Sequence, residues 1–296
     1  AMIEAANFAV RYDPAVKRRN LAPAMTGQHA GRFSLVEGDI RDRPALDGLF
    51  ASRRIDAVVH LAARAGVRPS IEDPLLYEDV NVKGTSNLLE ACRKHSVKRF
   101  VFGSSSSVYG DSTEVPFPED AKVDRPVSPY AATKVAGELL AYTYHHLFGL
   151  NVFCLRFFTV YGPRQRPEMA IHKFSRLILE GKTLPRFGDG RTERDYTYID
   201  EILDGLLKAL DRVEGYDIFN LVESRRVSLS RLIEVIEHEV GAKAKIESLP
   251  DQPGDVRMTC ADISKARRIL GYDPRVPIEE GVRRFVSWFK TEGRAR

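Results

Sequence analysis

Two side chains near the middle of the chain have the types and the spacing for acid–base chemistry. Tyr130 and Lys134 lie four residues apart, so they share one face of any helix that contains them. Ser128 and Pro129, as N-cap and first-turn residues, favour a helix start just before them. A nearby ammonium lowers the pKa of a tyrosine, which could then take a proton from a substrate hydroxyl and return it. The bare spacing also occurs on ordinary solvated helix faces, so the pair needs support from the rest of the chain.

The composition limits the kinds of protein that this chain can be. Its 296 residues are 43% hydrophobic and 29% charged, as is typical of a globular protein of one large or two modest domains. The net charge is +4, and the basic residues are scattered along the chain. This favours an anionic ligand over a nucleic-acid surface. Cys92, Cys154 and Cys260 have no metal-binding spacing, so we expect no metal site and a reducing, cytoplasmic location. We expect neither a membrane span nor a signal peptide.

Strand and helix patterns alternate through the first half of the chain. Nearly continuous apolar runs at 55–63 and 99–103 are typical of parallel strands that are covered on both faces. The pattern predicts an α/β fold with a Rossmann-like, doubly wound parallel sheet. We expect further strands at 33–40 and 151–157, and helices at 43–52, 79–94 and 130–148.

The composition changes after Val160, and we place a soft domain boundary there. Residues 1–160 would form the sheet domain, and 161–296 a smaller, mixed α/β substrate domain that interleaves with it. Residues 162–167 are expected to form an irregular polar segment, and 185–199 is glycine-rich and charged. We expect helices at 171–179, 200–212, 228–240, 263–270 and 278–290, with strands at 217–221 and 245–248.

Several motifs together resemble the extended short-chain dehydrogenase/reductase superfamily. They are Tyr130-x-x-x-Lys134, the serine run 104–107, His60-Leu61-Ala62-Ala63 and Asn81-Val82-Lys83-Gly84-Thr85. Segments 65–68, 156–167, 188–198 and 252–256 further resemble the UDP-glucuronate 4-epimerase branch of its NAD-dependent epimerase/dehydratase family. The resemblance spans roughly residue 12 to the C-terminus.

The resemblance implies a redox mechanism on a UDP-sugar, with NAD as cofactor. Tyr130 would be the general base toward the sugar 4-hydroxyl, and Lys134 would hold the nicotinamide ribose. Ser105 aligns best with the residue that hydrogen-bonds O4, and Ser106 is the alternative because four serines leave the register open. A hydride would leave C4 for NAD⁺ and return on the other face of a 4-keto sugar.

The same resemblance assigns supporting residues. The implied cofactor-binding residues are Asp39, Ile40, Ala62, Ala63, Arg64, Asn81 and Ser104, besides Tyr130 and Lys134. The implied substrate-binding residues are Arg68, Thr159, Arg166, His172, Arg194 and Arg257. Arg194 would meet the UDP diphosphate, although it could also form a surface pair with Asp195. Asp39 could instead be a plain turn residue.

The beginning of the chain departs from the family pattern. The family opens with a strand, a glycine-rich turn and a helix that receive the cofactor pyrophosphate, and no G-x-x-G-x-x-G precedes Tyr12 here. Ala6 stands where the family has an acidic residue for the adenosine ribose. We therefore expect the sheet to lack its first βα unit, and NAD binding to be weakened or lost. A fragment, a natural variant and a sequence that omits disordered residues all explain this.

Three functional hypotheses follow. The first is a nucleotide-sugar 4-epimerase that interconverts UDP-glucuronate and UDP-galacturonate, which accounts for the presence of both Tyr130 and Lys134. UDP-glucose 4-epimerisation or decarboxylation on the same fold is an alternative, whereas Ser105-Ser106 lacks the acidic partner of a dehydratase. The third is a non-catalytic UDP-sugar-binding protein. The family also implies a homodimer through the helices that carry Asn81 and Tyr130.

Overall fold

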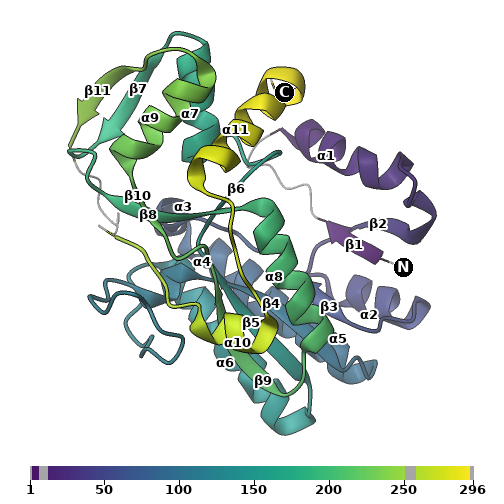
Figure 1. The fold of residues 1–296 in the computed structure, drawn as a ribbon. Coiled ribbons are helices and arrows are strands. Elements are labelled where there is room, and N and C mark those ends of the chain that lie inside the picture. Colours follow the sequence, from purple (N-terminus) through teal and green to yellow (C-terminus); the bar gives the residue numbers. More distant parts are fainter. Residues whose placement is uncertain (1, 7–12, 251–257, 294–296) are drawn as a thin grey trace.

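A four-stranded parallel sheet forms the centre of the protein (Figure 1). The computed structural model describes residues 2–6, 13–250 and 258–293. The sheet has the strand order β3-β4-β5-β9, and all neighbours are parallel. The strands are β3 (Val58–His60), β4 (Arg99–Ser105), β5 (Asn151–Phe157) and β9 (Tyr216–Leu221). This is the predicted Rossmann-like architecture.

Helices cover both faces of this sheet, because successive strand residues point to opposite sides. On one face, Phe100 and Phe102 of β4 pack with Leu89 and other apolar residues of the covering helices. On the other face, Val101 and Leu155 pack against a second set of helices. The first set is α2 (Arg43–Ser52), α5 (Gly84–Lys94) and α6 (Pro129–Phe148), and the second is α8 (Ile199–Arg212) and α10 (Ser264–Leu270).

A separate two-stranded parallel sheet lies beside the central one. It joins β1 (Met2–Ala6) to β2 (Phe33–Glu37), and α1 (Pro14–Thr26) and the 3₁₀ turn η1 (Ala30–Arg32) come between them in the sequence. Among the described strands, β1 is hydrogen-bonded only to β2, and β3 only to β4. The parallel sheet is therefore divided in two, as expected for a fold without its first βα unit.

The second half of the chain builds a smaller lobe with its own core, where Phe174, Leu232 and Phe285 pack together. Its helices are α7 (Ala170–Leu179), α9 (Leu229–Val240) and α11 (Ile278–Trp288). One small sheet joins β6 (Thr159–Tyr161), β8 (Glu193–Tyr198) and β10 (Arg226–Ser228), and another joins β7 (Thr183–Phe187) to β11 (Lys245–Leu249). From this half of the chain, β9 belongs to the central sheet, and α8 and α10 pack on it. The division at residue 160 therefore stays a prediction.

The structure corrects several predicted boundaries. The strand expected at 55–63 is only the three residues of β3, since it has one neighbour to pair with, and the strand expected at 33–40 ends at Glu37. The segment 185–199, for which no strand was predicted, contains most of β7 and all of β8. Its charged residues conceal a buried strand, because Asp195, Tyr196 and Thr197 are all enclosed.

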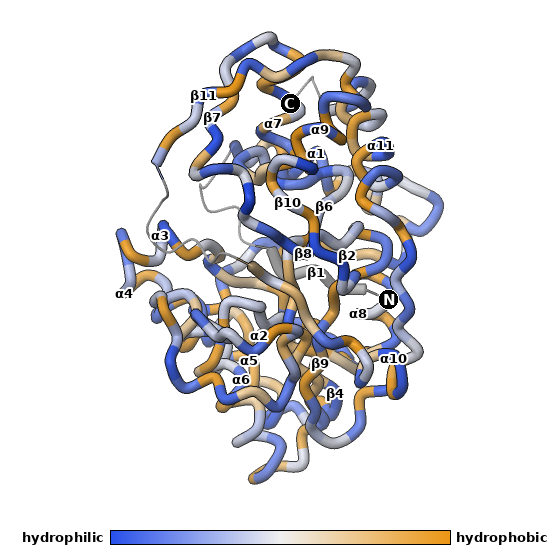
Figure 2. Tube along the Cα trace, turned by 60° about the vertical axis from the view of Figure 1, so that its left-hand side comes forward, coloured by the Kyte–Doolittle hydropathy of each residue, from blue (hydrophilic) through white to orange (hydrophobic). Residues whose placement is uncertain are grey.

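The remaining helical turns follow strands or continue longer helices. The predicted helix 79–94 is divided into a π-helical segment, η2 (Glu78–Lys83), and α5. Further short turns are α3 (Val67–Glu72), α4 (Pro74–Tyr77), η3 (Ser106–Tyr109) and η4 (Phe289–Gly293). Figure 2 shows apolar residues concentrated along the central strands. Within the described ranges, no helix is long and apolar enough to cross a membrane, and no cluster of side chains could hold a metal ion.

Candidate active site

Helix α6 presents the predicted acid–base pair at its first turns. The Ser128 hydroxyl caps the helix by accepting the Ala131 N–H at 3.1 Å, as the sequence predicts. Tyr130 follows in the first turn, half-buried, with its ring edge-on to the Tyr77 ring at 6.2 Å between centroids. A capped helix start holds the Tyr130 backbone in one place, which a proton-transferring side chain requires.

Lys134 lies one turn further along α6 and is buried. Its Nζ donates to the Gly103 carbonyl at 2.6 Å and stands over the Phe102 ring at 5.0 Å from the centroid. Burial lowers the pKa of Lys134 to about 8, while the Glu138 carboxylate acts in the opposite direction. The side chain therefore remains an ammonium at neutral pH, and it is fixed against the end of β4.

The serine run 104–107 continues β4 into the turn η3. The Ser105 hydroxyl accepts the Ser107 N–H at 3.2 Å, so Ser105 caps this turn. Ser104 is buried and donates to Glu138, away from the surface. Ser105 is 8% exposed, and Ser106 is half-buried. Which of these two contacts a substrate stays open, and so does a cofactor contact for Ser104.

Asn81 ties the end of β3 to α6. Its side-chain oxygen accepts the Arg64 N–H at 2.7 Å, and its amide nitrogen donates to the Arg64 carbonyl at 3.0 Å and to the Thr133 hydroxyl at 2.9 Å. Both amide hydrogens and one lone pair of the oxygen of this buried side chain are directed to the protein. Asn81 thus positions the segment of Ala62, Ala63 and Arg64 next to the helix that carries Tyr130.

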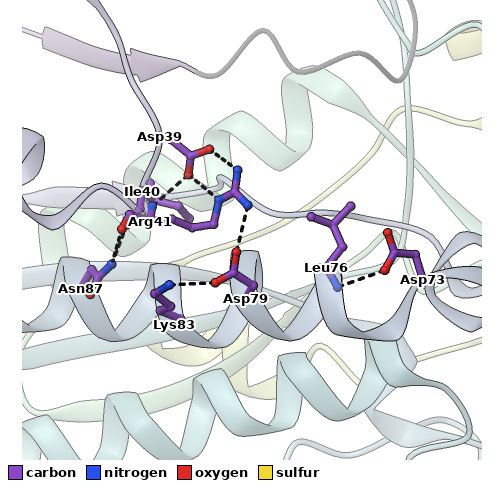
Figure 3. A network of polar contacts seen from close by, with 8 residues as sticks. All are labelled: Asp39, Ile40, Arg41, Asp73, Leu76, Asp79, Lys83 and Asn87. Carbon is purple, nitrogen blue, oxygen red and sulfur yellow. Dashed lines mark hydrogen bonds and ion pairs between the residues drawn. The ribbon is translucent and has the colours of Figure 1, made fainter.

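Asp39 lies in a network of ion pairs after β2 (Figure 3). Its carboxylate accepts the Arg41 N–H at 2.9 Å and the Arg41 guanidinium at 2.7 and 3.0 Å. Arg41 reaches on to Asp79 at 2.9 Å, and Lys83 pairs with the same carboxylate at 2.9 Å. The Ile40 carbonyl accepts from Asn87 at 3.0 Å. The network attaches β2 to η2 and α5, and a cofactor role for Asp39 and Ile40 remains a prediction.

The candidate substrate-binding residues have different surroundings. Arg68 is in the first turn of α3 and Thr159 is the first residue of β6, and the Arg68 guanidinium stands over the Phe187 ring of the smaller lobe at 5.8 Å. Arg166 pairs with Glu168 at 3.4 Å. Arg194 is half-buried in β8 and donates to the Glu193 carbonyl at 2.9 Å. Because Asp195 is fully buried, the alternative of a surface Arg194–Asp195 pair is wrong.

The structure does not bring His172 to this group. The ring is buried among aromatic side chains of the last helices, 4.9 Å from the Phe289 ring, and burial lowers its pKa to about 4. A neutral, enclosed imidazole is a poor partner for a carboxylate, so its predicted role has no support in its surroundings. Arg257 and the motif 252–256 lie outside the described residues.

The sequence interpretation missed a buried ion pair next to the predicted acid–base pair. Arg156 of β5 holds the Glu138 carboxylate with two hydrogen bonds of 3.0 and 2.8 Å, and the side chains are 1% and 4% exposed. Arg156 also donates to the Tyr109 hydroxyl at 3.0 Å, which donates to Asn220 at 2.7 Å. The spacing of Lys134 and Glu138, four residues on one helix, was the available signal.

The residues present fit one end of a dinucleotide better than the other. Lys134 offers an ammonium beside the end of β4, and Tyr130 a phenol one turn earlier on the same helix, as a nicotinamide ribose needs. No G-x-x-G-x-x-G turn links a strand to a helix before β3 within the described ranges, so the donors that usually hold a pyrophosphate are not found there. The fit is thus partial, and no reaction step is derived through the pyrophosphate end.

Comparison with known proteins decides the family. Residues 6–285 match the family described as GDP-mannose 4,6 dehydratase. The chain belongs to the NAD-dependent epimerase and dehydratase family. It is 48% identical over 259 residues to a UDP-glucuronate 4-epimerase of Thermodesulfobacterium geofontis, covering 87% of this chain and 80% of that protein. It is 43% identical to UDP-glucuronate 4-epimerase 4 of Arabidopsis thaliana, covering 96% of this chain and 68% of that protein.

Solved structures of this epimerase and dehydratase family have the same fold. UDP-glucuronic acid 4-epimerase from Bacillus cereus, in complex with UDP-glucuronic acid and NAD, has a TM-score of 0.89 and 36% identity, covering 97% of this chain and 90% of that one. A dTDP-glucose 4,6-dehydratase from Streptomyces venezuelae has a TM-score of 0.88 and 31% identity, covering 98% and 87%. The predicted family, fold and enzyme class are confirmed.

Proposed function

We propose that this protein is a nucleotide-sugar 4-epimerase that interconverts UDP-glucuronate and UDP-galacturonate. The observation that carries the proposal is the Tyr130–Lys134 pair at the start of α6, with Lys134 fixed against the end of β4. The similarity to relatives named UDP-glucuronate 4-epimerase supports the substrate. NAD is the proposed cofactor, since the similar Bacillus cereus enzyme was solved with NAD.

The chemistry proposed for the chain's own residues is proton transfer. The buried ammonium of Lys134 favours the phenolate of Tyr130, which accepts the proton of the sugar 4-hydroxyl. The serine end of β4, at Ser105 or Ser106, provides a hydroxyl to orient O4. NAD, when bound, accepts and returns the hydride of C4. Tyr130 then gives the proton back to the 4-keto oxygen, and the protein ends as it began.

The direct test is incubation with NAD⁺ and UDP-glucuronate, followed by chromatographic separation of the two UDP-hexuronates. We expect UDP-galacturonate to form, and Tyr130→Phe to lower the rate at least roughly 100-fold, as for loss of a general base. Tyr142→Phe, a half-exposed tyrosine of the same helix, is the matched control and should leave the rate unchanged. No product at any NAD⁺ concentration would contradict the proposal, and conversion of UDP-glucose alone would correct the substrate.

A second candidate is a non-catalytic UDP-sugar-binding protein. It is favoured by the division of the parallel sheet between β1 and β3, and by the Asp39 carboxylate, which Arg41 already occupies. This candidate predicts binding of UDP-glucuronate without binding of NAD⁺ and without turnover. Calorimetric titration with each ligand separates it from the epimerase.

Homodimer formation remains part of the proposal. The surface of α6 exposes Leu139 and Leu147, about two turns apart, at 63% and 61%. Such apolar residues on one helix support a helix-to-helix contact between two copies. Sedimentation equilibrium of the wild type and of Leu139→Lys would test it, and a monomeric wild type would contradict it.

A further inference from the structure

The buried Glu138–Arg156 pair lies directly behind the proposed acid–base pair. Glu138 is one turn after Lys134 on α6. The Ser104 hydroxyl binds Glu138, and the neighbouring Gly103 carbonyl binds Lys134, so two successive residues of β4 contact the two side chains. The network therefore reaches the site through one strand end and one helix face.

Burying this ion pair costs free energy of folding. Removing a carboxylate and a guanidinium from water costs several kcal/mol per ion, and apolar replacements of similar volume are often as stable. Here both ions have several partners: Arg156 binds Glu138 twice, the Tyr109 hydroxyl, and the Glu119 carbonyl at 3.1 Å, and Glu138 also accepts from Ser104. A buried ion pair in this place calls for a role besides stability.

The groups that face Lys134 differ in charge. His60 of β3 is buried, and burial together with the Lys134 charge lowers its pKa to about 3, so it is neutral. Burial raises the pKa of the Cys154 thiol of β5 well above its usual value, so it is neutral too. Phe102 and the Gly103 carbonyl of β4 are uncharged, and Arg156 is a cation. Besides the proposed phenolate of Tyr130, Glu138 is the one anion among these groups.

We propose that Glu138 is a positioning residue for the Tyr130–Lys134 pair and keeps Lys134 an ammonium at the end of β4. Without it, an isolated amine at this depth would give up its proton, because burial disfavours the charged form. Arg156 and Ser104 hold the Glu138 carboxylate in place. The catalytic meaning of this role rests on the proposed epimerase function, but the charge of Lys134 does not.

The test is a pH titration of the Lys134 Nζ resonance in ¹⁵N-lysine-labelled protein, with the resonance assigned by Lys134→Arg. We expect Glu138→Gln to lower the midpoint by at least about one pH unit, a tenfold change in proton affinity. Ser104→Ala keeps the carboxylate, so its midpoint should stay close to that of the wild type. Glu90→Gln, which removes a carboxylate of α5 paired with Arg93, is the matched control and should leave the midpoint unchanged.

Glu138→Gln leaves the buried Arg156 guanidinium without its carboxylate, and this could prevent the variant from folding. The double variant Glu138→Gln/Arg156→Met removes the unpaired charge as well. The midpoint should fall in this variant as well. An unchanged midpoint in either folded variant would overturn the proposal. Because the readout does not use turnover, failure of the epimerase function and failure of this proposal are distinguishable. If turnover is found, the pH profile of kcat should move with the Lys134 midpoint.

Discussion

Two parts of this protein use the same kind of strand in very different surroundings. In β4 and β5, parallel strands that pair on both edges, all interior residues are buried. In β2, four residues are half-buried and the fifth is exposed, and helix α1 has no buried residue. A parallel strand reaches the interior only when neighbours cover its edges and its faces.

The difference divides the candidate site as well. Tyr130, Lys134 and the serine run belong to the well-packed region, where backbone positions are fixed by burial. Asp39 and Ile40 follow β2, which is attached to the rest through the Arg41 network (Figure 3) and through Ile40, whose side chain is buried among apolar residues of α2 and α5. We therefore expect the region of Tyr130 and Lys134 to be more rigid than β2 and the half-buried residues around it.

The largest effect should come from shortening one leucine in each region. Leu155 of β5 is completely buried, so Leu155→Ala should lower the free energy of unfolding by about 2–5 kcal/mol. Leu35→Ala in the half-buried β2 is the matched variant and should cost about 1 kcal/mol or less. Urea unfolding measures both, and equal losses would break the comparison.

Amide hydrogen exchange should show the next largest difference. Amides of β4 and β5 should exchange only through global unfolding, while those of β1 and β2 should exchange through local opening. We expect at least about 100-fold slower exchange in the central strands, after correction for intrinsic rates. Similar protection in the two sheets would show that β1–β2 is as firmly held as the central strands.

The smallest expected effect is a loss of folding stability at low pH. Hydrogen bonds from Arg41, and then from Lys83, lower the pKa of Asp79. A lowered carboxyl pKa gives stability that is present above the unfolded value of about 4 and is lost as pH falls through the folded pKa. The difference in stability between wild type and Asp79→Asn should therefore disappear between pH 5 and about pH 2, while the Leu155→Ala difference persists. A pH-independent Asp79→Asn difference would contradict the ion-pair attachment.

Most of the central sheet could be predicted from the sequence, for physical reasons. The predicted strand 151–157 agrees with β5 at both ends, since a strand buried on both faces is a plain apolar run. The length of β3 could not be predicted, because it depends on a pairing partner. Strand β8 was missed because its central position buries Asp195 and Thr197, whose types suggest a loop.

The candidate site, too, could be predicted only where the signal is local in the sequence. The Tyr130–Lys134 pair and its Ser128 cap follow from local spacing, which the structure confirms for the cap. The Glu138–Arg156 pair joins a helix to a strand 18 residues away, so no local pattern contains both partners. His172 looked available for a ligand, yet the aromatic rings of α11 and η4 enclose it, and this depends on how the last helices pack.

The most direct test of the central claim is a calorimetric titration of NAD⁺ into the purified protein with UDP present. The account predicts saturable binding that Lys134→Met weakens roughly ten- to hundredfold, as for loss of a charged hydrogen bond. Tyr142→Phe should bind as the wild type does. Absence of any NAD⁺ binding while UDP binds would contradict the epimerase proposal and leave a nucleotide-sugar-binding protein.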